Sequence, residues 1–506
     1  MEFHESSPFI FITRGFIFIA ISIAVLRRII SKKTKTLPPG PWKLPLIGNL
    51  HQFLGSVPHQ ILRDLAQKNG PLMHLQLGEV SAIVATSPQM AKEITKTLDL
   101  QFADRPVIQA LRIVTYDYLD ISFNAYGKYW RQLRKIFVQE LLTSKRVRSF
   151  CSIREDEFSN LVKTINSANG KSINLSKLMT SCTNSIINKV AFGKVRYERE
   201  VFIELINQIL ALAGGFKLVD LFPSYKILHV LEGTERKLWE IRGKIDKILD
   251  KVIDEHRENS SRTGKGNGCN GQEDIVDILL KIEDGGDLNL DIPFGNNNIK
   301  ALLFDIIAGG TETSSTAVDW AMAEMMRNPH VMKKAQKEIR EAFNGKEKIE
   351  ENDIQNLKYL KLVIQETLRL HPPAPLLMRQ CREKCEIGGY HIPVGTKAFI
   401  NVWAIGRDPA YWPNPESFIP ERFDDNTYEF TKSEHHTFEY LPFGAGRRMC
   451  LGISFGLANV ELPLALLLYH FNWQLPDGST DLDMTEATGL AARRKYDLHL
   501  IATSYA

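Results

Sequence analysis

Cysteine is scarce in this chain, and its scarcity excludes one class of fold. Six cysteines lie in 506 residues, which is far too few for a scaffold held together by disulfides. Cys381 and Cys385 stand four residues apart on a charged segment, but no second pair of cysteines or histidines accompanies them. We therefore expect no zinc site there, and the low cysteine content favours a reducing compartment.

Strong net charge and interdomain linkers are missing as well. A net charge of only +4 gives no reason to expect a nucleic-acid partner. No long linker divides the sequence, and helical patterns with the same character flank the polar stretch of residues 259–270. With 44% hydrophobic and 24% charged residues, the composition is that of an ordinary globular protein. One large domain is therefore expected despite the length of the chain.

The start of the chain has an apolar run with no lysine or arginine ahead of it. Residues 9–26 are mostly apolar, and several basic residues follow closely. A cleaved signal peptide has the opposite order, and basic residues after the span keep that side cytoplasmic. We predict a membrane anchor over residues 1–30, a basic and proline-rich hinge over 31–45 and a catalytic domain over 46–506. Arg14 interrupts the span, so a tail lying on the membrane surface is the alternative.

A glycine-rich loop with one cysteine lies near the C-terminus. It covers residues 443–452, with glycines at 444, 446 and 452 and arginines at 447 and 448. The glycines would give positive φ, so that the loop wraps around the Cys450 sulfur close to a flat ligand. A helix expected from Ile453 and the two arginines would lower the pKa of the thiol, which favours the metal-binding thiolate. The alternative is a buried structural cysteine.

This loop resembles the haem-binding signature of the cytochrome P450 superfamily, with matches at Phe443, Gly446, Arg448, Cys450 and Gly452. The resemblance implies that haem b is bound through the Cys450 thiolate, with Phe443, Gly446 and Arg448 shaping its site. It also implies the fold of that family, which is mainly α with small β-sheets and holds haem between a long central helix and the cysteine loop. Such a thiolate favours cleavage of the O–O bond.

The long central helix is expected over residues 298–327, about 45 Å in length. Gly309 and Gly310 near its middle cost about 1 kcal/mol each relative to alanine, so we expect them to make room for a planar cofactor or small ligand. The hydroxyls at 311, 313 and 314 would donate hydrogen bonds to backbone carbonyls earlier in the helix and so widen the turn. A helix contact through small residues is the alternative. The segment resembles the oxygen-binding groove of the family, which implies that Thr313 steers protons to bound oxygen and Glu312 gates their supply.

Two further motifs resemble family elements. Trp130 and Arg134 are four residues apart and share a helix face, and they resemble a pair that holds a haem propionate; a solvated surface pair is the alternative. Glu366 and Arg369 are three apart, and Arg422 follows in a Pro-Glu-Arg-Phe segment. These resemble a structural cluster beneath the haem, which charge-assisted hydrogen bonds would hold.

Segments near the hinge, over residues 73–79 and around the cysteine loop look like plant microsomal members that oxidise terpenes, such as premnaspirodiene oxygenase and casbene oxidases. The chain is therefore expected to insert one oxygen atom from O2 into a sesquiterpene or diterpene. Alternatives are a phenolic or other non-terpenoid specialised metabolite, a haem isomerase or dehydratase that inserts no oxygen, and a haem sensor or carrier. An apolar pocket is expected to include Ile306, Gly309, Leu376, Leu377 and Leu490.

The segment over residues 376–380 departs from those relatives, because it is one residue short and lacks a proline. It would border the pocket, where Arg379 would reach a propionate.

We find no segment that binds flavin or dinucleotide, so NADPH would supply electrons through a separate NADPH-cytochrome P450 reductase. The resemblance also implies O2 as co-substrate and attachment to the endoplasmic reticulum membrane, with the catalytic domain facing the cytosol.

Overall fold

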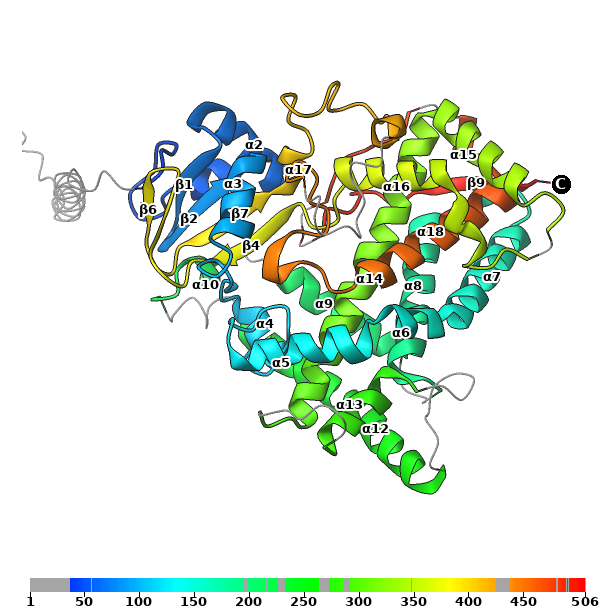
Figure 1. Cartoon of the computed structure of the whole chain (residues 1–506), viewed down its shortest axis with the longest axis horizontal. Coiled ribbons are helices and arrows are strands. Elements are labelled where there is room, and N and C mark those ends of the chain that lie inside the picture. The colour runs from blue at the N-terminus through cyan, green and yellow to red at the C-terminus, as the bar shows by residue number, and fades with distance from the viewer. Residues whose placement is uncertain are drawn as a thin grey trace, which may run out of the picture.

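A four-stranded sheet lies at one end of the molecule, and helices make up most of the rest (Figure 1). The computed structural model describes residues 37–505, except for 56, 195–198, 214–216, 226–232, 264–272, 286–291, 347, 425–436, 479–480, 488 and 490. The predicted anchor over residues 1–30 and the first part of the predicted hinge lie outside the described residues. The prediction of a mainly helical chain with small sheets is confirmed.

The four-stranded sheet joins the two ends of the catalytic region. Its order is β1 (Leu72–Leu77), β2 (Val80–Ala85), β7 (Lys397–Asn401) and β4 (Leu376–Gln380). β1 and β2 form a hairpin whose turn contains Gly78, with a φ of +61°. β2 runs parallel to β7, with Ala82 opposite Lys397, and β4 runs antiparallel to β7.

The remaining strands in the part of the chain that the structure describes form two smaller sheets. One has the order β3 (Ser172–Asn174), β9 (His499–Ser504) and β8 (Phe471–Gln474), and the other pairs β5 (Cys385–Ile387) with β6 (Tyr390–Ile392). The β3–β9–β8 sheet attaches the C-terminal strand to the helical part, because Leu175 at the start of a helix donates its N–H to the Leu498 carbonyl at 2.9 Å.

The described α-helices cluster around one long central helix (Figure 1). Their bounds are α2 Pro58–Asn69, α3 Pro88–Lys92, α4 Gln109–Val114, α5 Lys128–Ile136, α6 Ser144–Ser149, α7 Cys151–Ser167, α8 Leu175–Phe192, α9 Arg199–Leu212, α10 Leu218–Leu221, α12 Thr234–Thr263, α13 Ile275–Glu283, α14 Asn296–Arg327, α15 Pro329–Ala342, α16 Lys358–Leu370, α17 Val402–Ile405 and α18 Ile453–His470.

The central helix is α14, with 32 residues. It packs against α8, α16 and α18, and its second half is almost wholly buried, with Trp320 fully inside. The helix ends at Arg327, with Asn328 as its C-cap, because Pro329 has no N–H to continue the hydrogen-bond ladder and itself begins α15. The long helix predicted over residues 298–327 is therefore present, with two additional residues at its start.

The helix after the cysteine loop, α18, is strongly apolar. Among the described residues, α18 is the one helix whose length and composition would let it cross a membrane, with a mean hydropathy of 1.3, and 56% of that stretch is buried. It packs against α7, α14 and α15. Burial on several sides accounts for its apolar character, as in the core helix of a large domain.

The described part of the proline-rich segment is attached to the sheet. The His74 N–H of β1 donates to the Pro39 carbonyl at 2.8 Å, and Asn49 donates through Nδ2 to the Trp42 carbonyl at 3.1 Å. A Cβ on Gly40 would lie 2.0 Å from the His74 carbonyl oxygen, so a larger residue would separate the segment from β1. The segment is fixed to the catalytic body from Pro39 onward.

Candidate functional site

Two of the three glycines in the cysteine loop have the conformation that the sequence predicts. Gly444 and Gly446 both have φ of +72°. A Cβ on Gly446 would lie 2.1 Å from the Thr95 carbonyl oxygen, so this position excludes every side chain. Gly452 differs from the prediction: it is the N-cap of α18 with φ of −93°. The loop closes because the Cys450 N–H donates to the Phe443 carbonyl at 3.0 Å.

The surroundings of Cys450 raise the pKa of its thiol, and the predicted lowering is wrong for this structure. Desolvation by the surrounding atoms disfavours the thiolate, although Cys450 itself is exposed, and only a hydrogen bond from the Gly452 backbone acts in the other direction. The two arginines point elsewhere. Arg447 forms an ion pair with Asp99 at 2.6 Å, and Arg448 donates to backbone carbonyls. A bound metal cation would reverse the direction, because a metal stabilises the thiolate directly.

A cavity separates the cysteine loop from α14. We call it the thiol cavity. Cys450 and Phe443 line it from the loop, and Ile306, Gly309 and Thr313 line it from the helix. The structure thus brings together the predicted metal ligand and the predicted hydroxyl of the oxygen-binding groove across one cavity.

The two mid-helix glycines serve different purposes. A Cβ on Gly309 would meet no atom within 4 Å, so this glycine leaves space in the thiol cavity. A Cβ on Gly310 would lie 2.5 Å from Cδ1 of Ile187 on α8, so this glycine allows α8 and α14 to approach each other. Of the two alternatives from the sequence, room for a ligand describes Gly309, and a helix contact through small residues describes Gly310, which also lines the thiol cavity.

The hydroxyls of this segment do not break the helix. Thr313 donates through Oγ1 to the Gly309 carbonyl at 2.8 Å, and Ser315 donates to the Thr311 carbonyl at 3.1 Å, yet α14 is helical throughout. Thr311 Oγ1 is buried and has no hydrogen-bond partner among the described residues. The predicted widening of the turn is therefore absent at this point of α14.

Glu312 lies on a different face of α14 from Thr313. It lines a second cavity, which we call the polar cavity, together with Thr311, Ser315, Asp319 and Arg493. Burial raises the pKa of the Glu312 carboxyl, and the charge of Arg493 opposes this shift only in part. A carboxyl with a raised pKa can carry a proton closer to neutral pH.

Buried arginines gather beside the thiol cavity. Burial lowers the pKa of Arg105 to about 10, and burial together with repulsion from Arg105 lowers that of Arg448 to about 9. The pKa of Arg379 is lowered well below its ordinary value for the same reasons. The nearby carboxyl groups balance this positive charge only in part, because burial raises the pKa of Asp305 to about 6 and so favours its uncharged form. This excess of buried positive charge fits a ligand with carboxylates, as the two propionates of haem would provide.

Trp130 and Arg134 lie together on α5, but neither is free of protein contacts. The Trp130 indole N–H donates to the Ile121 carbonyl at 3.0 Å, and Arg134 Nη1 donates to the Arg447 carbonyl at 2.8 Å. The guanidinium carbons of Arg134 and Arg448 lie 5.6 and 4.5 Å from the centre of the Trp130 ring. The three side chains thus form one stacked group at the edge of the thiol cavity.

Sequence reasoning missed two charged residues at this site. Arg105 lines the thiol cavity and donates through Nε to the Ser122 carbonyl at 3.1 Å. Asp305 lines it from α14 and accepts from the Ile121 N–H at 2.7 Å. Asp305 directly precedes Ile306, which the helical spacing identified as a pocket residue. Extending that set of predicted residues by one position would have included Asp305. No local pattern marks Arg105, because its place depends on a distant part of the chain.

The predicted substrate-pocket residues do not all lie at the thiol cavity. Ile306 and Gly309 line it. Leu376 packs in the apolar cluster of the four-stranded sheet, and Leu377 lies against Gly444, where a Cβ would be 3.3 Å from its Cδ1. Leu490 lies outside the described residues. The departing segment 376–380 forms β4, which holds Arg379 close to the Ala445 carbonyl at 3.4 Å.

Glu366, Arg369 and Arg422 form one buried cluster. Glu366 accepts from Arg369 Nε at 2.6 Å and from Arg422 Nε at 3.0 Å, and both Glu366 and Arg369 have side chains with 0% exposure. Arg369 also donates to the carbonyls of Gly406 and Pro415 at 2.6 and 2.7 Å. The cluster therefore fixes the irregular segment before the cysteine loop to α16.

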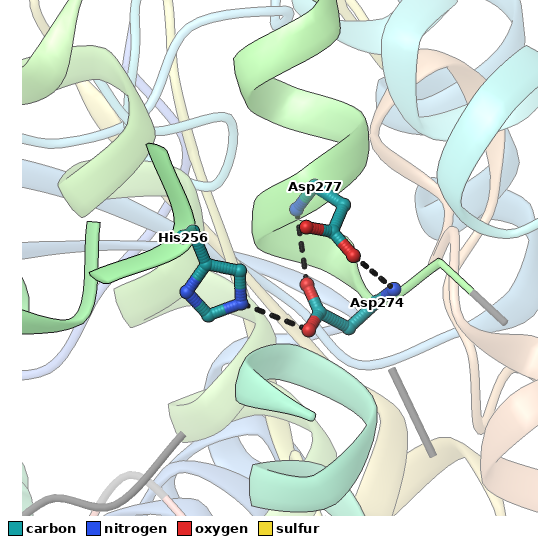
Figure 2. Close-up of side chains that lie close together, drawn as sticks. All are labelled: His256, Asp274 and Asp277. Atoms are coloured by element: carbon teal, nitrogen blue, oxygen red, sulfur yellow. Dashed lines mark hydrogen bonds and ion pairs between the residues drawn. The ribbon is translucent and has the colours of Figure 1, made fainter. Parts of the chain in front are cut away.

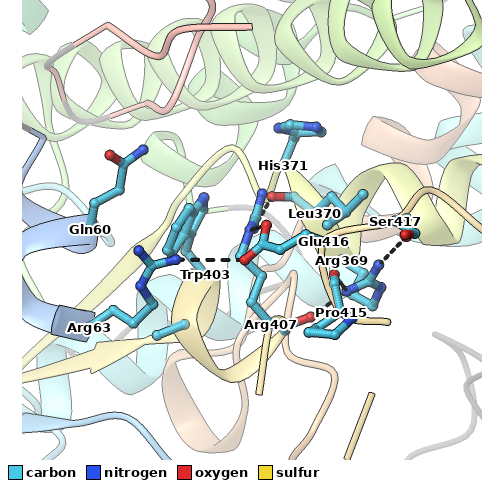
Figure 3. Close-up of polar contacts among 12 residues, drawn as sticks. Gln60, Arg63, Arg369, Leu370, His371, Trp403, Arg407, Pro415, Glu416 and Ser417 are labelled. Carbon is cyan, nitrogen blue, oxygen red and sulfur yellow. Dashed lines mark hydrogen bonds and ion pairs between the residues drawn. The ribbon is translucent and has the colours of Figure 1, made fainter. Parts of the chain in front are cut away.

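A second set of contacts extends from this cluster to α2 (Figure 3). Glu416 accepts from Arg407 Nε at 3.1 Å and lies 3.6 Å from Arg63 Nη1. The guanidinium carbons of Arg407 and Arg63 lie 4.0 and 4.9 Å from the Trp403 ring centre. Arg407 also donates to the Leu370 carbonyl. The N-terminal helix is thus connected to the segment beneath the cysteine loop.

A buried group of His256, Asp274 and Asp277 has the residue types of a metal site, but its hydrogen bonds explain it (Figure 2). Asp274 and Asp277 form a capping box at the start of α13. His256 Nε2 lies 2.9 Å from Asp274 Oδ2, and its Nδ1 lies 2.7 Å from the Val252 carbonyl. The group therefore attaches α13 to α12.

Comparison with known proteins agrees with this geometry. Residues 38–500 match the family model "Cytochrome P450". Two structures of a zebrafish cytochrome P450, one with abiraterone and one with progesterone, superimpose with a TM-score of 0.74 each, at 24% and 23% identity. Each alignment covers 89% of this chain and 100% of the other, which shows the shared fold.

The chain belongs to the cytochrome P450 family, and it is a cytochrome P450 monooxygenase of plant specialised metabolism. It is 97% identical to tabersonine 3-oxygenase of Catharanthus roseus and 80% identical to (+)-vincadifformine 19-hydroxylase of the same plant, over 100% of each chain. It is 56% identical to premnaspirodiene oxygenase of Hyoscyamus muticus over 94% of each chain. Membership of the family implies a haem-thiolate cofactor, a reductase partner and a small-molecule substrate.

The resemblance to this plant branch is confirmed, but the expected sesquiterpene or diterpene substrate is wrong. The relative at 97% identity is named for tabersonine, a monoterpenoid indole alkaloid. The motifs that suggested a terpene lie in the hinge, in β1 and around the cysteine loop. The described part of the hinge is bonded to β1, β1 pairs with β2, and neither segment lines the thiol cavity. Motifs in these two segments therefore identify the family and do not specify the substrate.

Proposed function

We propose that this chain is a haem-thiolate monooxygenase that inserts one oxygen atom from O2 into tabersonine or a close monoterpenoid indole alkaloid. The observation that carries the proposal is the 97% identity to tabersonine 3-oxygenase over the whole length of both chains. The relative at 80% identity is named for vincadifformine, which supports the same class of substrate.

Cys450 would supply the thiolate that holds the haem, and it is kept in place by the turn at Gly446 and by the hydrogen bond from its own N–H to the Phe443 carbonyl. Haem bound there would supply the oxidation chemistry. Arg448 and Arg105 would face its propionates, with Arg134 and Trp130 at the edge of the cavity. Ile306 and Gly309 would face the substrate, because they line the thiol cavity from α14.

Thr313 and Glu312 are the proposed proton-handling residues. The Thr313 hydroxyl hydrogen is donated to the Gly309 carbonyl, so its oxygen can accept a hydrogen bond from a water in the thiol cavity. Glu312 would hold a proton at its carboxyl, which its raised pKa favours. The side chains would thus take a proton from the polar cavity and present it to the thiol cavity.

Electrons would come from NADPH through NADPH-cytochrome P450 reductase. Residues 1–30 would anchor the chain in the endoplasmic reticulum membrane with the catalytic domain in the cytosol. The attachment of the segment from Pro39 onward to β1 supports a fixed orientation of the catalytic domain relative to such an anchor.

The test supplies membranes containing this protein, a plant reductase and NADPH with tabersonine, vincadifformine and premnaspirodiene in parallel. We expect a tabersonine product heavier by one oxygen atom, which requires NADPH and is absent with Cys450→Ser. No product from tabersonine, despite a normal thiolate-type carbon monoxide spectrum, would refute the substrate. Survival of that spectrum in Cys450→Ser would refute the ligand assignment.

A further inference from the structure

Cys381 and Cys385 lie side by side at the turn between β4 and β5. Their sulfur atoms are 3.9 Å apart. Cys381 is fully buried and is fixed to the residues just before β7, because its N–H donates to the Thr396 carbonyl at 2.9 Å and its carbonyl accepts from the Gly395 N–H at 2.7 Å. Cys385 begins the short strand β5 and is only partly buried.

The two thiols differ in a way that suits a nucleophile and its partner. The Cys381 Sγ lies 3.0 Å from the Glu383 carbonyl oxygen, to which it can donate, and 3.9 Å from the Cys385 Sγ, and the contact between the two sulfurs lowers the pKa of Cys385. The same contact and burial raise the pKa of Cys381. The more accessible sulfur is therefore the one that ionises more readily, which is the arrangement found in cysteines that react with oxidants.

The distance also allows a covalent bond. A disulfide needs a sulfur separation of about 2.0 Å, so the two sulfurs, 3.9 Å apart, must move closer together. The turn of Arg382, Glu383 and Lys384 between them is exposed or half-buried, so it has room to adjust.

We propose that Cys381 and Cys385 form a reversible dithiol–disulfide pair that hydrogen peroxide oxidises. The Cys385 thiolate attacks one peroxide oxygen; the O–O bond breaks, and Cys385 becomes a sulfenic acid while one water leaves after protonation. The Cys381 sulfur then attacks the Cys385 sulfur, the S–O bond breaks, and a second water leaves with the Cys381 proton. Two thiols and one peroxide thus yield one disulfide and two waters. A cytosolic thiol such as glutathione reverses the oxidation by exchange.

The rest of the chain offers a matched control. Cys151 is also partly buried, but it donates to Glu155, and burial raises the pKa of its thiol to about 12. It has comparable exposure and lacks a second cysteine within hydrogen-bond distance among the described residues. Cys151 should therefore react at least about tenfold more slowly than Cys385.

The test uses the full-length haem-loaded protein in membranes. It is treated with hydrogen peroxide, its remaining thiols are blocked with N-ethylmaleimide, and it is digested with trypsin without reductant. Trypsin cuts after Arg379, Arg382, Lys384 and Lys397, so the two cysteines fall in separate peptides, residues 380–382 and 385–397. We expect these peptides as a linked pair, two hydrogens lighter than their sum, which dithiothreitol separates.

Variants then assign the roles. Cys381→Ser should leave a sulfenic acid on Cys385 that dimedone traps, Cys385→Ser should give no such adduct at Cys381, and Cys151→Ser should leave the linked pair unchanged. The wild-type chain alone already decides the proposal if a variant fails to fold. Oxidation of Cys385 without the linked pair, or loss of the Cys151 thiol as fast as that of Cys385, would overturn it.

Discussion

Glu312 and Thr313 are neighbours on α14, yet their side chains line different cavities. Thr313 faces Cys450 across the thiol cavity, and Glu312 faces Asp319 and Arg493 in the polar cavity. The same turn of α14 therefore borders two cavities: the thiol cavity, where the reaction would take place, and the polar cavity, which is lined by carboxyl, hydroxyl and guanidinium groups. The pair sits where a proton must cross if it travels from one to the other.

Replacement of Glu312 by glutamine tests this arrangement. We expect product formation to fall about 100-fold, because the amide cannot release a proton, while the Kd for the substrate stays within about twofold because Glu312 does not line the thiol cavity. Turnover and the substrate-induced spectral shift measure the two effects. Ser315→Ala, in the same polar cavity, is the control and should retain most activity. Normal turnover in the Glu312→Gln enzyme would show that protons arrive by another path.

The two glycines of α14 should respond oppositely to alanine. Gly310→Ala should destabilise the fold by about 1–3 kcal/mol, because its Cβ would lie 2.5 Å from Ile187 Cδ1. Ile187→Val removes that atom, so the double variant should recover most of the loss. Gly309→Ala should fold as well as the parent or up to about 1 kcal/mol better, while its methyl group narrows the thiol cavity. Thermal unfolding of the four proteins checks this, and equal losses for both glycines would contradict it.

The Glu366 cluster should be important for folding. Glu366→Gln leaves two arginines with incomplete partners, and we expect a loss of about 3–5 kcal/mol, seen as little folded protein and little haem incorporation. Lys334→Ala provides the control, because the Lys334–Glu421 pair on the same side of α16 is about half exposed and should contribute less than about 1 kcal/mol. Similar yields of the two variants would argue against the structural role.

Asp319 should make stability depend on pH. Burial raises the pKa of its carboxyl to about 6 from 3.8, while the Ser176 hydroxyl and Arg494 oppose the shift. The folded chain therefore holds this proton more tightly than the unfolded chain, so stability falls as pH rises from about 4 to about 6.

Asp319→Asn removes this titration. Relative to the variant, the wild type should lose roughly 2 kcal/mol between about pH 4.5 and 7.5, which for a chain of this length is a change in the Tm difference of about 2 °C. Melting curves of both proteins at the two pH values measure it. Equal changes in Tm for the wild type and the variant between the two pH values would show that burial does not raise the pKa of Asp319.

Features with a local cause could be predicted from the sequence. The length of α14, the β1–β2 hairpin and the shared helix face of Glu366 and Arg369 each follow from periodicity, turn residues or spacing within a few positions. Features set by distant contacts could not. The place of Arg105 at the thiol cavity depends on segments that the sequence cannot bring together by pattern alone.

The charge around Cys450 shows the same limit. Proximity in sequence suggested that Arg447 and Arg448 would stabilise a thiolate, but Arg447 pairs with Asp99 and Arg448 bonds to carbonyls. The substrate could not be predicted for a related reason, since the motifs that identify the family shape the hinge, the cysteine loop and the clusters beneath it. Two members can share all of these and accept different molecules.

The parallel pairing of β2 with β7 also has a consequence for biosynthesis. Ala82 lies opposite Lys397, more than 300 residues later in the chain. At about 5–20 residues per second, roughly 15–60 s of translation separate the two strands. The early hairpin must therefore leave the ribosome with the backbone edge of β2 lacking its final neighbour, and this edge can pair with another chain until β7 has been made.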